Sequence, residues 1–302
     1  MASLFPPPGP GLPSFRTMLF KGPYHASAPI HLMLSHVASN PKSKALMLSP
    51  SRQSLALALV DFNDEWLNTH GADGATCDAS SRVNILYPPT RAHYTLLLSM
   101  LHTHQGTFHH PKTTLPISPS LLILHEISAL GIIDQPEATL ASYLSLISHA
   151  LTAVNHLAVQ SSIGVALAVF DSGLENLKLP VLRPISPGPG DQSQPATLRK
   201  ESIAMCVEKY FEWTGTAERK HLPLLRDSVT LSIEHTIVLG HSNSSPTEAH
   251  ANAVNEGKNM RMVFRREQDS PPSEIIWTWV LRMRPAHVGD DKPGGKYFEW
   301  IL

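Results

Sequence analysis

The residues best placed to do chemistry follow a short apolar strand, Met18–Phe20, and precede an apolar helix. Strand, polar loop and helix in this order are the layout of a phosphate-binding loop, whose consensus is G-x-x-x-x-G-K-[ST]. Aligned on Gly22, the consensus places its second glycine, its lysine and its hydroxyl residue at Ser27, Ala28 and Pro29. The strand, loop and helix of such a motif are present in the right order, but the residues that would bind phosphate and Mg²⁺ are missing.

In a working loop the lysine neutralises the phosphates, the hydroxyl holds Mg²⁺ and glycine lets backbone amides approach the ligand. Ala28 carries no charge, and Pro29 has neither a hydroxyl nor an amide hydrogen. We therefore predict a degenerate loop without ATP hydrolysis, and we expect no bound ATP and no other cofactor. Two alternatives stay open. An anion could sit on the helix N-terminus beside Lys21 or His25, or GPYHASAP is an ordinary strand–helix connection.

A second ATPase motif has a degenerate counterpart in the run SLLILHE, Ser120–Glu126. In ATPases four apolar residues precede an aspartate, the Walker B residue, which orients the Mg²⁺ shell. His125 stands at that position here, and Glu126 follows it. Glu126 could act as a base on water, but without a lysine and a hydroxyl partner we expect a structural strand end.

Arginines on a predicted C-terminal hairpin form the one cationic feature. Its two arms are expected at Met260–Glu267 and Glu274–Arg284, with Trp277 and Trp279 on one face of the second arm. Arginines that grip phosphates beside aromatics that stack on bases would form a nucleic-acid-binding patch. The alternative is an edge hairpin with core tryptophans and solvated arginines. The candidate nucleic-acid-binding residues are Arg261, Arg265, Arg266, Arg282 and Arg284.

Other reactive residues form no convincing site. The histidines of HTHQGTFHH could bind a transition metal, but no cysteine or carboxylate accompanies them, so we expect a solvated loop and no metal. These histidines are His102, His104, His109 and His110. No G-x-S-x-G elbow occurs, and no nucleophile and base can be selected.

Composition narrows the class of protein. The chain has 302 residues, 42% of them hydrophobic, and a formal net charge of −1, so nucleic acid could be bound only through a local patch. Its two cysteines, far apart, are typical of a reducing compartment. Residues 1–14 look like a disordered Pro-rich leader rather than a signal peptide. No apolar run reaches the roughly 18 residues that span a bilayer, so we expect no membrane contact.

Strands alternate with helices through residues 15–170, which predicts a parallel sheet with helices on both faces. Residues 171–198 are rich in Pro, Gly and Ser and are expected to be a mobile loop, and residues 199–302 a β-rich part of the same domain. Further strands are expected at Lys44–Ser49, Arg82–Tyr87 and Ser161–Phe170, helices at Arg52–Asn68, Thr90–His104 and Gln135–Gln160, and a loop at Thr69–Ser81.

This order of elements resembles a RecA-type recombinase core, over roughly Arg16–Phe170. It runs from the loop-like strand and helix through KALMLS, VNILYPP, SLLILHE and SSIGVALAVF to a mobile loop and terminal strands. The resemblance implies a three-layer α/β RecA-like P-loop fold with a β-rich C-terminal extension. In that family the loops after the second motif face DNA, and residues 171–197 would correspond to them.

The degenerate members that the chain resembles are of two kinds, recombinase paralogues, including the ATPase-like partners of the Shu complex, and the RecA-like accessory ring of Elongator. The first kind implies a nuclear, non-catalytic subunit, a pseudo-ATPase in homologous recombination and DNA repair. It would form a hetero-oligomer with a paralogous or SWIM-type protein and could bind single-stranded DNA. The alternative is a cytoplasmic accessory subunit of Elongator, in tRNA wobble-uridine modification.

Overall fold

The computed structural model describes most of the chain, and the statements below concern only that part. The described residues are 1–103, 114–115, 117–133, 138–161, 164–181, 199–219, 258–267, 269, 271–284 and 294–301. Of the residues singled out in the sequence, His104, His109, His110 and residues 182–198 lie outside these ranges.

Nine strands form one sheet in the order β13-β12-β11-β10-β1-β7-β6-β2-β3. The six from β10 to β3 pair in parallel, and β11, β12 and β13 continue the sheet antiparallel. The parallel strands are β1 (Thr17–Lys21), β2 (Ala45–Leu48), β3 (Val83–Leu86), β6 (Leu121–His125), β7 (Ala166–Asp171) and β10 (Trp213–Arg219). The antiparallel strands are β11 (Lys258–Arg266), β12 (Ser273–Arg284) and β13 (Gly295–Trp300).

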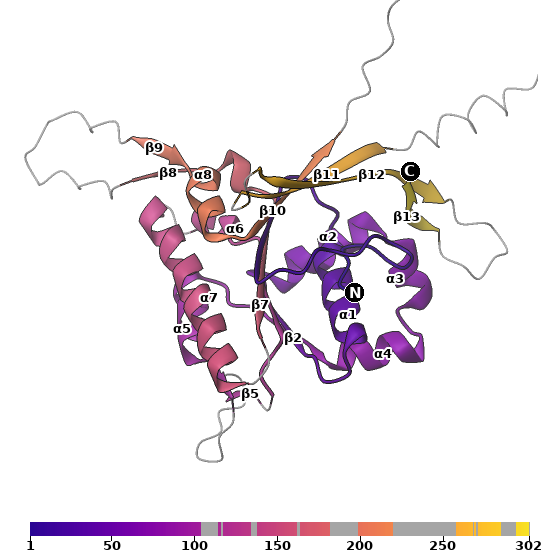
Figure 1. Ribbon diagram of the computed structural model, residues 1–302, viewed down its shortest axis with the longest axis horizontal. Coiled ribbons are helices and arrows are strands. Elements are labelled where there is room, and N and C mark those ends of the chain that lie inside the picture. The colour runs from indigo at the N-terminus through magenta and orange to yellow at the C-terminus, as the bar shows by residue number, and fades with distance from the viewer. Residues whose placement is uncertain are drawn as a thin grey trace, which may run out of the picture.

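Helices cover both faces of the parallel part, as apolar strands such as Leu121–His125 require. On one face lie α1 (Ala28–Ser39), α2 (Arg52–Phe62), α3 (Glu65–His70) and α4 (Gly74–Ser81), and on the other α5 (Arg91–Met100) and α7 (Leu140–Gln160) (Figure 1). The smaller elements are α6 (Ser128–Ile133), α8 (Ile203–Val207), the 3-10 turns η1 (Leu174–Asn176) and η2 (Glu208–Tyr210), and two short ladders. Those ladders pair β4 (His102–Thr103) with β5 (Thr114–Leu115), and β8 (Lys178–Pro180) with β9 (Lys200–Ser202).

Two hydrophobic cores follow from this layering. One joins α5, α7 and α8 to the sheet, around Tyr94, Ile147 and Val169. The other joins α1 to the opposite sheet face and extends along β11 and β12, around Leu32, Phe170 and Phe264. Strands β11 to β13 arch over α2 and α3 (Figure 1), and β13 contacts α3.

The predicted architecture is confirmed, a three-layer α/β fold with a parallel central sheet and a β-rich C-terminal extension. Residues 22–27 connect the central strand β1 to α1, which packs on the sheet, as expected of a phosphate-binding loop. No helix among the described residues is both long enough and apolar enough to cross a bilayer.

The N-terminal residues differ from the expectation of a disordered leader. Leu4 and Phe5 are almost fully buried, and the Phe5 ring contacts the rings of Trp279 and Trp300 at centroid distances of 4.9 and 4.6 Å. A composition rich in proline predicts little regular structure, and these residues indeed form none. Two apolar side chains are nevertheless enough to anchor the segment in the core, because burying each removes its surface from water.

Several predicted boundaries were also wrong. The helix expected over Arg52–Asn68 is split because Asn63 is left-handed, with φ 52°, and Asp64 then caps α3. The expected loop Thr69–Ser81 contains α4, and α7 starts at Leu140 because Thr139 forms a capping box with Ser142. The expected mobile loop is structured at its start, where η1 and β8 form. Residues 203–207, expected in a β-rich region, form α8.

Candidate nucleotide site

The degenerate loop, residues 22–27, lies against the neighbouring strand β10. Gly22 has φ +78°, a conformation that L side chains rarely adopt, and a Cβ there would come within 2.4 Å of the carbonyl oxygen of Ala217. Glycine is therefore required at this position for the close approach of loop and strand. The expected alignment on Gly22 is thus consistent with a structural need for this residue.

Several positions around the loop offer no free amide to a phosphate. Pro23 has no N–H, and the Tyr24 N–H donates to the Gly22 carbonyl at 2.8 Å. The Ala28 N–H donates to the carbonyl of His25 at 2.9 Å, and Pro29 has no N–H. Among the first three residues of α1, therefore, only Ile30 has a backbone N–H without a hydrogen bond in the described part of the chain. Helix N-termini bind anions through several free amides, so this end of α1 offers far less than a working loop.

Side chains of the loop and of α1 form a buried network with Asp64, the N-cap residue of α3. Ser27 Oγ donates to Asp64 Oδ2 at 2.5 Å, and His31 Nε2 lies 2.9 Å from the same oxygen. Burial alone would raise the pKa of Asp64, but the hydrogen bonds from His31 and Ser27 outweigh it and lower that pKa. The carboxylate is thereby held charged beside Ser27, the residue at the position of the second consensus glycine.

His25 fills the loop from within. Its Nδ1 lies 3.0 Å from Ser27 Oγ, and its ring packs against Phe5, Phe62 and Phe298 at centroid distances of 4.9, 5.5 and 4.8 Å. Burial, followed by the nearby His31, lowers the pKa of His25 to about 3. The imidazole is therefore neutral at ordinary pH and supplies no charge to an anion.

Lys21, the other residue that could have supplied charge, is neutralised by two carboxylates. Its Nζ lies 2.7 Å from Glu208 and 3.2 Å from Glu175. Burial would lower the pKa of Lys21, but these two partners outweigh that effect and raise it. The lysine thus joins the end of β1 to η1 and η2 instead of pointing into the loop.

The degenerate Walker B residues are both structural in their contacts. His125 is buried with Nδ1 3.1 Å from Ser49 Oγ, and burial lowers its pKa. Glu126 has φ 51°, accepts a short hydrogen bond from the Tyr24 hydroxyl, and accepts a 2.9 Å hydrogen bond from Ser172 Oγ. Glu126 therefore joins the degenerate loop to the residues that follow β7.

Asp171 is a buried acid that the sequence analysis did not select. It ends β7 with none of its side chain exposed, and its Oδ2 accepts hydrogen bonds from the Ser128 amide at 2.9 Å and the Tyr143 hydroxyl at 2.7 Å. Its Oδ1 has no partner among the described residues. Burial raises the pKa of Asp171 to about 7. In the sequence, Asp171 could have been noticed as a lone carboxylate that directly follows the apolar residues AVF.

The hairpin arginines do not form the free cationic patch that was expected, because four of the five pair with carboxylates. Arg266 pairs with Glu212 at 2.8 Å and lies over the Trp213 ring, and Arg265 lies 3.6 Å from Glu274. Arg282 pairs with Glu299, and Arg284 pairs with Glu65. Arg261 alone has no carboxylate partner among the described residues. The hairpin itself, β11 paired with β12, is confirmed.

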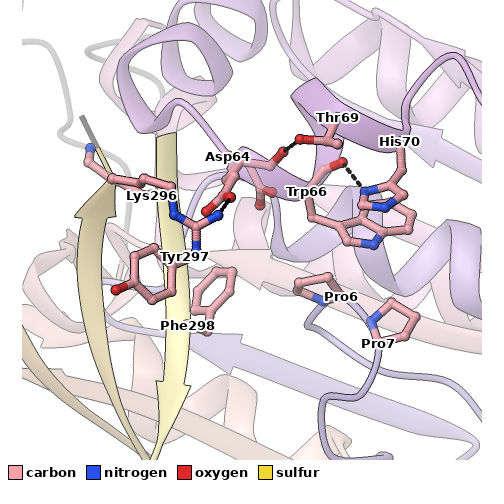
Figure 2. A pocket seen from close by; sticks show the side chains of 11 residues that line it. Pro6, Pro7, Asp64, Trp66, Thr69, His70, Lys296, Tyr297 and Phe298 are labelled. Carbon is pink, nitrogen blue, oxygen red and sulfur yellow. Dashed lines mark hydrogen bonds and ion pairs between the residues drawn. The ribbon is translucent and has the colours of Figure 1, made fainter. Parts of the chain in front are cut away.

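Two cavities flank β13 on the loop side. The first, about 350 Å³, lies between the N-terminal residues, α3 and β13. In it Pro6 and Pro7 face Phe298, and Trp66 stacks on His70 with a centroid distance of 5.2 Å (Figure 2). The second, about 310 Å³, is bounded by residues 23–26 of the loop, the end of α2 and residues of β10, β11, β12 and β13. We call the second the strand-end cavity.

No metal centre is found in the part of the chain that the structure describes, where no three His, Cys, Asp or Glu side chains gather as ligands. His102 instead places its Nδ1 2.8 Å from the carbonyl of Met100. The remaining three histidines of the expected cluster are outside the described residues.

Comparison with known proteins identifies no family for the chain. No protein-family model matches the sequence, and no curated protein matches it. Among solved structures it is similar to one titled "Crystal structure of the RadB recombinase", with a TM-score of 0.39 and 11% identity, over 92% of this chain and 88% of that one. A likeness this weak carries no argument about function, so the function proposed below rests on the site.

Proposed function

We propose that this protein is a non-catalytic RecA-like subunit that supports homologous recombination and DNA repair as part of a nuclear hetero-oligomer. The observation that carries the non-catalytic role is the closed loop. Its first helical amide is bonded to His25, the next residue is Pro29, and Lys21 is held by two glutamates. Phosphoryl transfer depends on a positioned cation and metal, and the loop supplies neither.

A protein partner is supported by the surface of α2, next to the loop. Phe62 at the end of this helix contacts His25, while Leu57 and Val60 are 54% and 73% exposed. Apolar side chains one turn apart on an exposed helix are typical of an interface. We propose that a paralogous or SWIM-type protein covers this exposed face of α2, which the helical turn places on the side opposite Phe62 and the degenerate loop.

The first experiment titrates the purified protein with ATP, with and without Mg²⁺. We expect no Mg²⁺-dependent binding. Tight Mg²⁺-dependent binding, or steady hydrolysis, would overturn the non-catalytic role.

The second experiment identifies the partner by affinity purification of the full chain from its own cells, followed by mass spectrometry. We expect a RecA-type paralogue or a SWIM-type protein, lost with Leu57→Glu and kept with Leu96→Glu. Leu96 is a matched control because it is also 54% exposed but lies on α5, on the opposite face of the sheet. Recovery of Elongator subunits would instead favour the tRNA-modification role and exclude the recombination role.

A further inference from the structure

We propose that the strand-end cavity binds a phosphate group, held by cations of the sheet rather than by amides of the loop. Arg219, Lys258 and Lys296 line this cavity, and Asp61 is the one carboxylate among its lining residues. The excess of positive charge lies beside the loop that cannot itself bind phosphate. If the phosphate belongs to a polynucleotide, this inference rests on the proposed function and extends it. If the phosphate belongs to a free nucleotide, the inference is independent of the proposed function.

The register of the extension explains why these cations gather. Arg219 pairs with Met260, Lys258 pairs with Leu281, and Lys296 pairs with Met283. Because side chains alternate between faces along a strand, residues two apart in register share one face. The three cations therefore lie in successive rows of the face that carries the buried Trp279, where the apolar core ends at the edge of the sheet.

These cations are available, unlike the four hairpin arginines that pair with carboxylates. Arg219 and Lys258 are exposed, and neither has a carboxylate partner among the described residues. Lys296 donates one hydrogen bond, to the Asp61 carbonyl at 2.9 Å, and lies over the Phe62 ring at 5.2 Å. An ammonium group has three donors, so Lys296 keeps donors for a ligand. Exposed cations that converge on a concave surface are typical of a phosphate-binding site.

His25 determines how a ligand would lie. Ser27 donates its hydroxyl hydrogen to Asp64, so the Nδ1–H of the neutral His25 must donate to Ser27, and Nε2 is left as an acceptor. That nitrogen has no partner among the described residues, and His25 lines the cavity while only 7% exposed. A neutral acceptor repels an anion. The phosphate therefore lies at the rim, on the strand cations, and the uncharged part of the ligand lies toward the loop.

The size of the cavity, about 310 Å³, is near the lower end of typical small-ligand pockets. It accommodates a phosphate together with one attached organic group. The shared chemistry is a phosphate ester, supplied either by a free nucleotide or by single-stranded nucleic acid.

Binding can be tested on the full-length protein by isothermal titration calorimetry with pyrophosphate at low salt. We expect saturable binding that weakens at least about tenfold in Arg219→Gln/Lys258→Gln, because two charge-assisted contacts are lost. Asp61→Asn should tighten binding about two- to threefold, because it removes a like charge. Arg265→Gln, at another exposed arginine that lies on the other face of the extension, should change nothing.

Absence of binding to the wild type, or an equal loss in Arg265→Gln, would overturn the site. A second set of titrations, with AMP and with a short single-stranded oligonucleotide, distinguishes the two sources of phosphate. Weakening of either ligand by the double variant supports the site, and weakening of neither overturns it. Loss of the partner on Leu57→Glu is independent of these outcomes, so the two proposals can fail separately.

Discussion

The hydroxyl of Ser27 donates a 2.5 Å hydrogen bond to the carboxylate of Asp64, which lies 37 residues further along the chain. Both side chains are nearly completely buried, and the same carboxylate oxygen accepts from His31 at 2.9 Å. The other oxygen accepts from the Leu67 amide and so caps α3. One acid thus fixes the degenerate loop, α1 and α3 relative to one another.

Asp64→Ala should lower the free energy of unfolding by about 3 kcal/mol, because it leaves the buried Ser27 and His31 without their acceptor and removes a helix cap. Urea denaturation followed by circular dichroism measures the change. Asp73→Ala is the matched control, since Asp73 precedes α4 without a side-chain cap. Equal losses in both variants would show that the network does not stabilise the fold.

The same carboxylate should make stability depend on acid. Its pKa is lowered in the folded state, so its contribution is present above the unfolded value of 3.8 and is lost as the pH falls through the folded value. The unfolding free energy of the wild type should therefore drop more steeply between pH 5 and pH 2 than that of Asp64→Asn. Urea titrations at several pH values check this, and parallel curves for the two proteins would contradict it.

Asp171 should act in the opposite direction. Burial raises its pKa from 3.8 to about 7, so the folded protein binds a proton that the unfolded chain has lost, and stability from this group falls as the pH rises from about 4 to 7. Between pH 5 and pH 8 the loss is about 2–3 kcal/mol. Asp171→Asn should remove this slope. Asp78→Asn, at a side chain 73% exposed, should leave it unchanged, and a slope that survives Asp171→Asn would assign it to another group.

Lys21 should matter for stability and not for phosphate. Lys21→Gln leaves Glu175 and Glu208 without their shared cation and should cost about 1–2 kcal/mol, a modest value because the site is partly solvated. Pyrophosphate binding should be unchanged. Denaturation and calorimetry on the same sample give both numbers, with the exposed Lys178→Gln as a control. A loss of pyrophosphate binding with full stability would return Lys21 to the role of a phosphate ligand.

Phe5 tests whether the N-terminal residues are part of the fold. Its ring contacts the rings of His25, Trp279, Phe298 and Trp300. Phe5→Ala should lower the unfolding free energy by about 3–4 kcal/mol, as is usual for a buried aromatic. Val60→Ala, at a side chain 73% exposed, should cost little. Equal stability of Phe5→Ala and the wild type would show that residues 1–14 do not pack in solution.

The sequence by itself determined the parallel sheet and the place of the loop within it. Apolar runs such as Leu121–His125 can be read locally, because a strand covered on both faces needs apolar residues at every position. The missing lysine and hydroxyl at Ala28 and Pro29 are equally visible, since a motif is a fixed spacing along the chain.

Only the tertiary structure decided which polar groups meet. The partners of Ser27, Lys21 and Arg284 are 37, 154 or more, and 219 residues away. No local pattern encodes such a separation, because the register between distant strands and helices depends on how the whole core packs. For the same reason the sequence pointed to the hairpin arginines as a patch. Folding pairs most of them with carboxylates, whereas Arg219 and Lys258 beside the loop have no carboxylate partner in the described part of the chain.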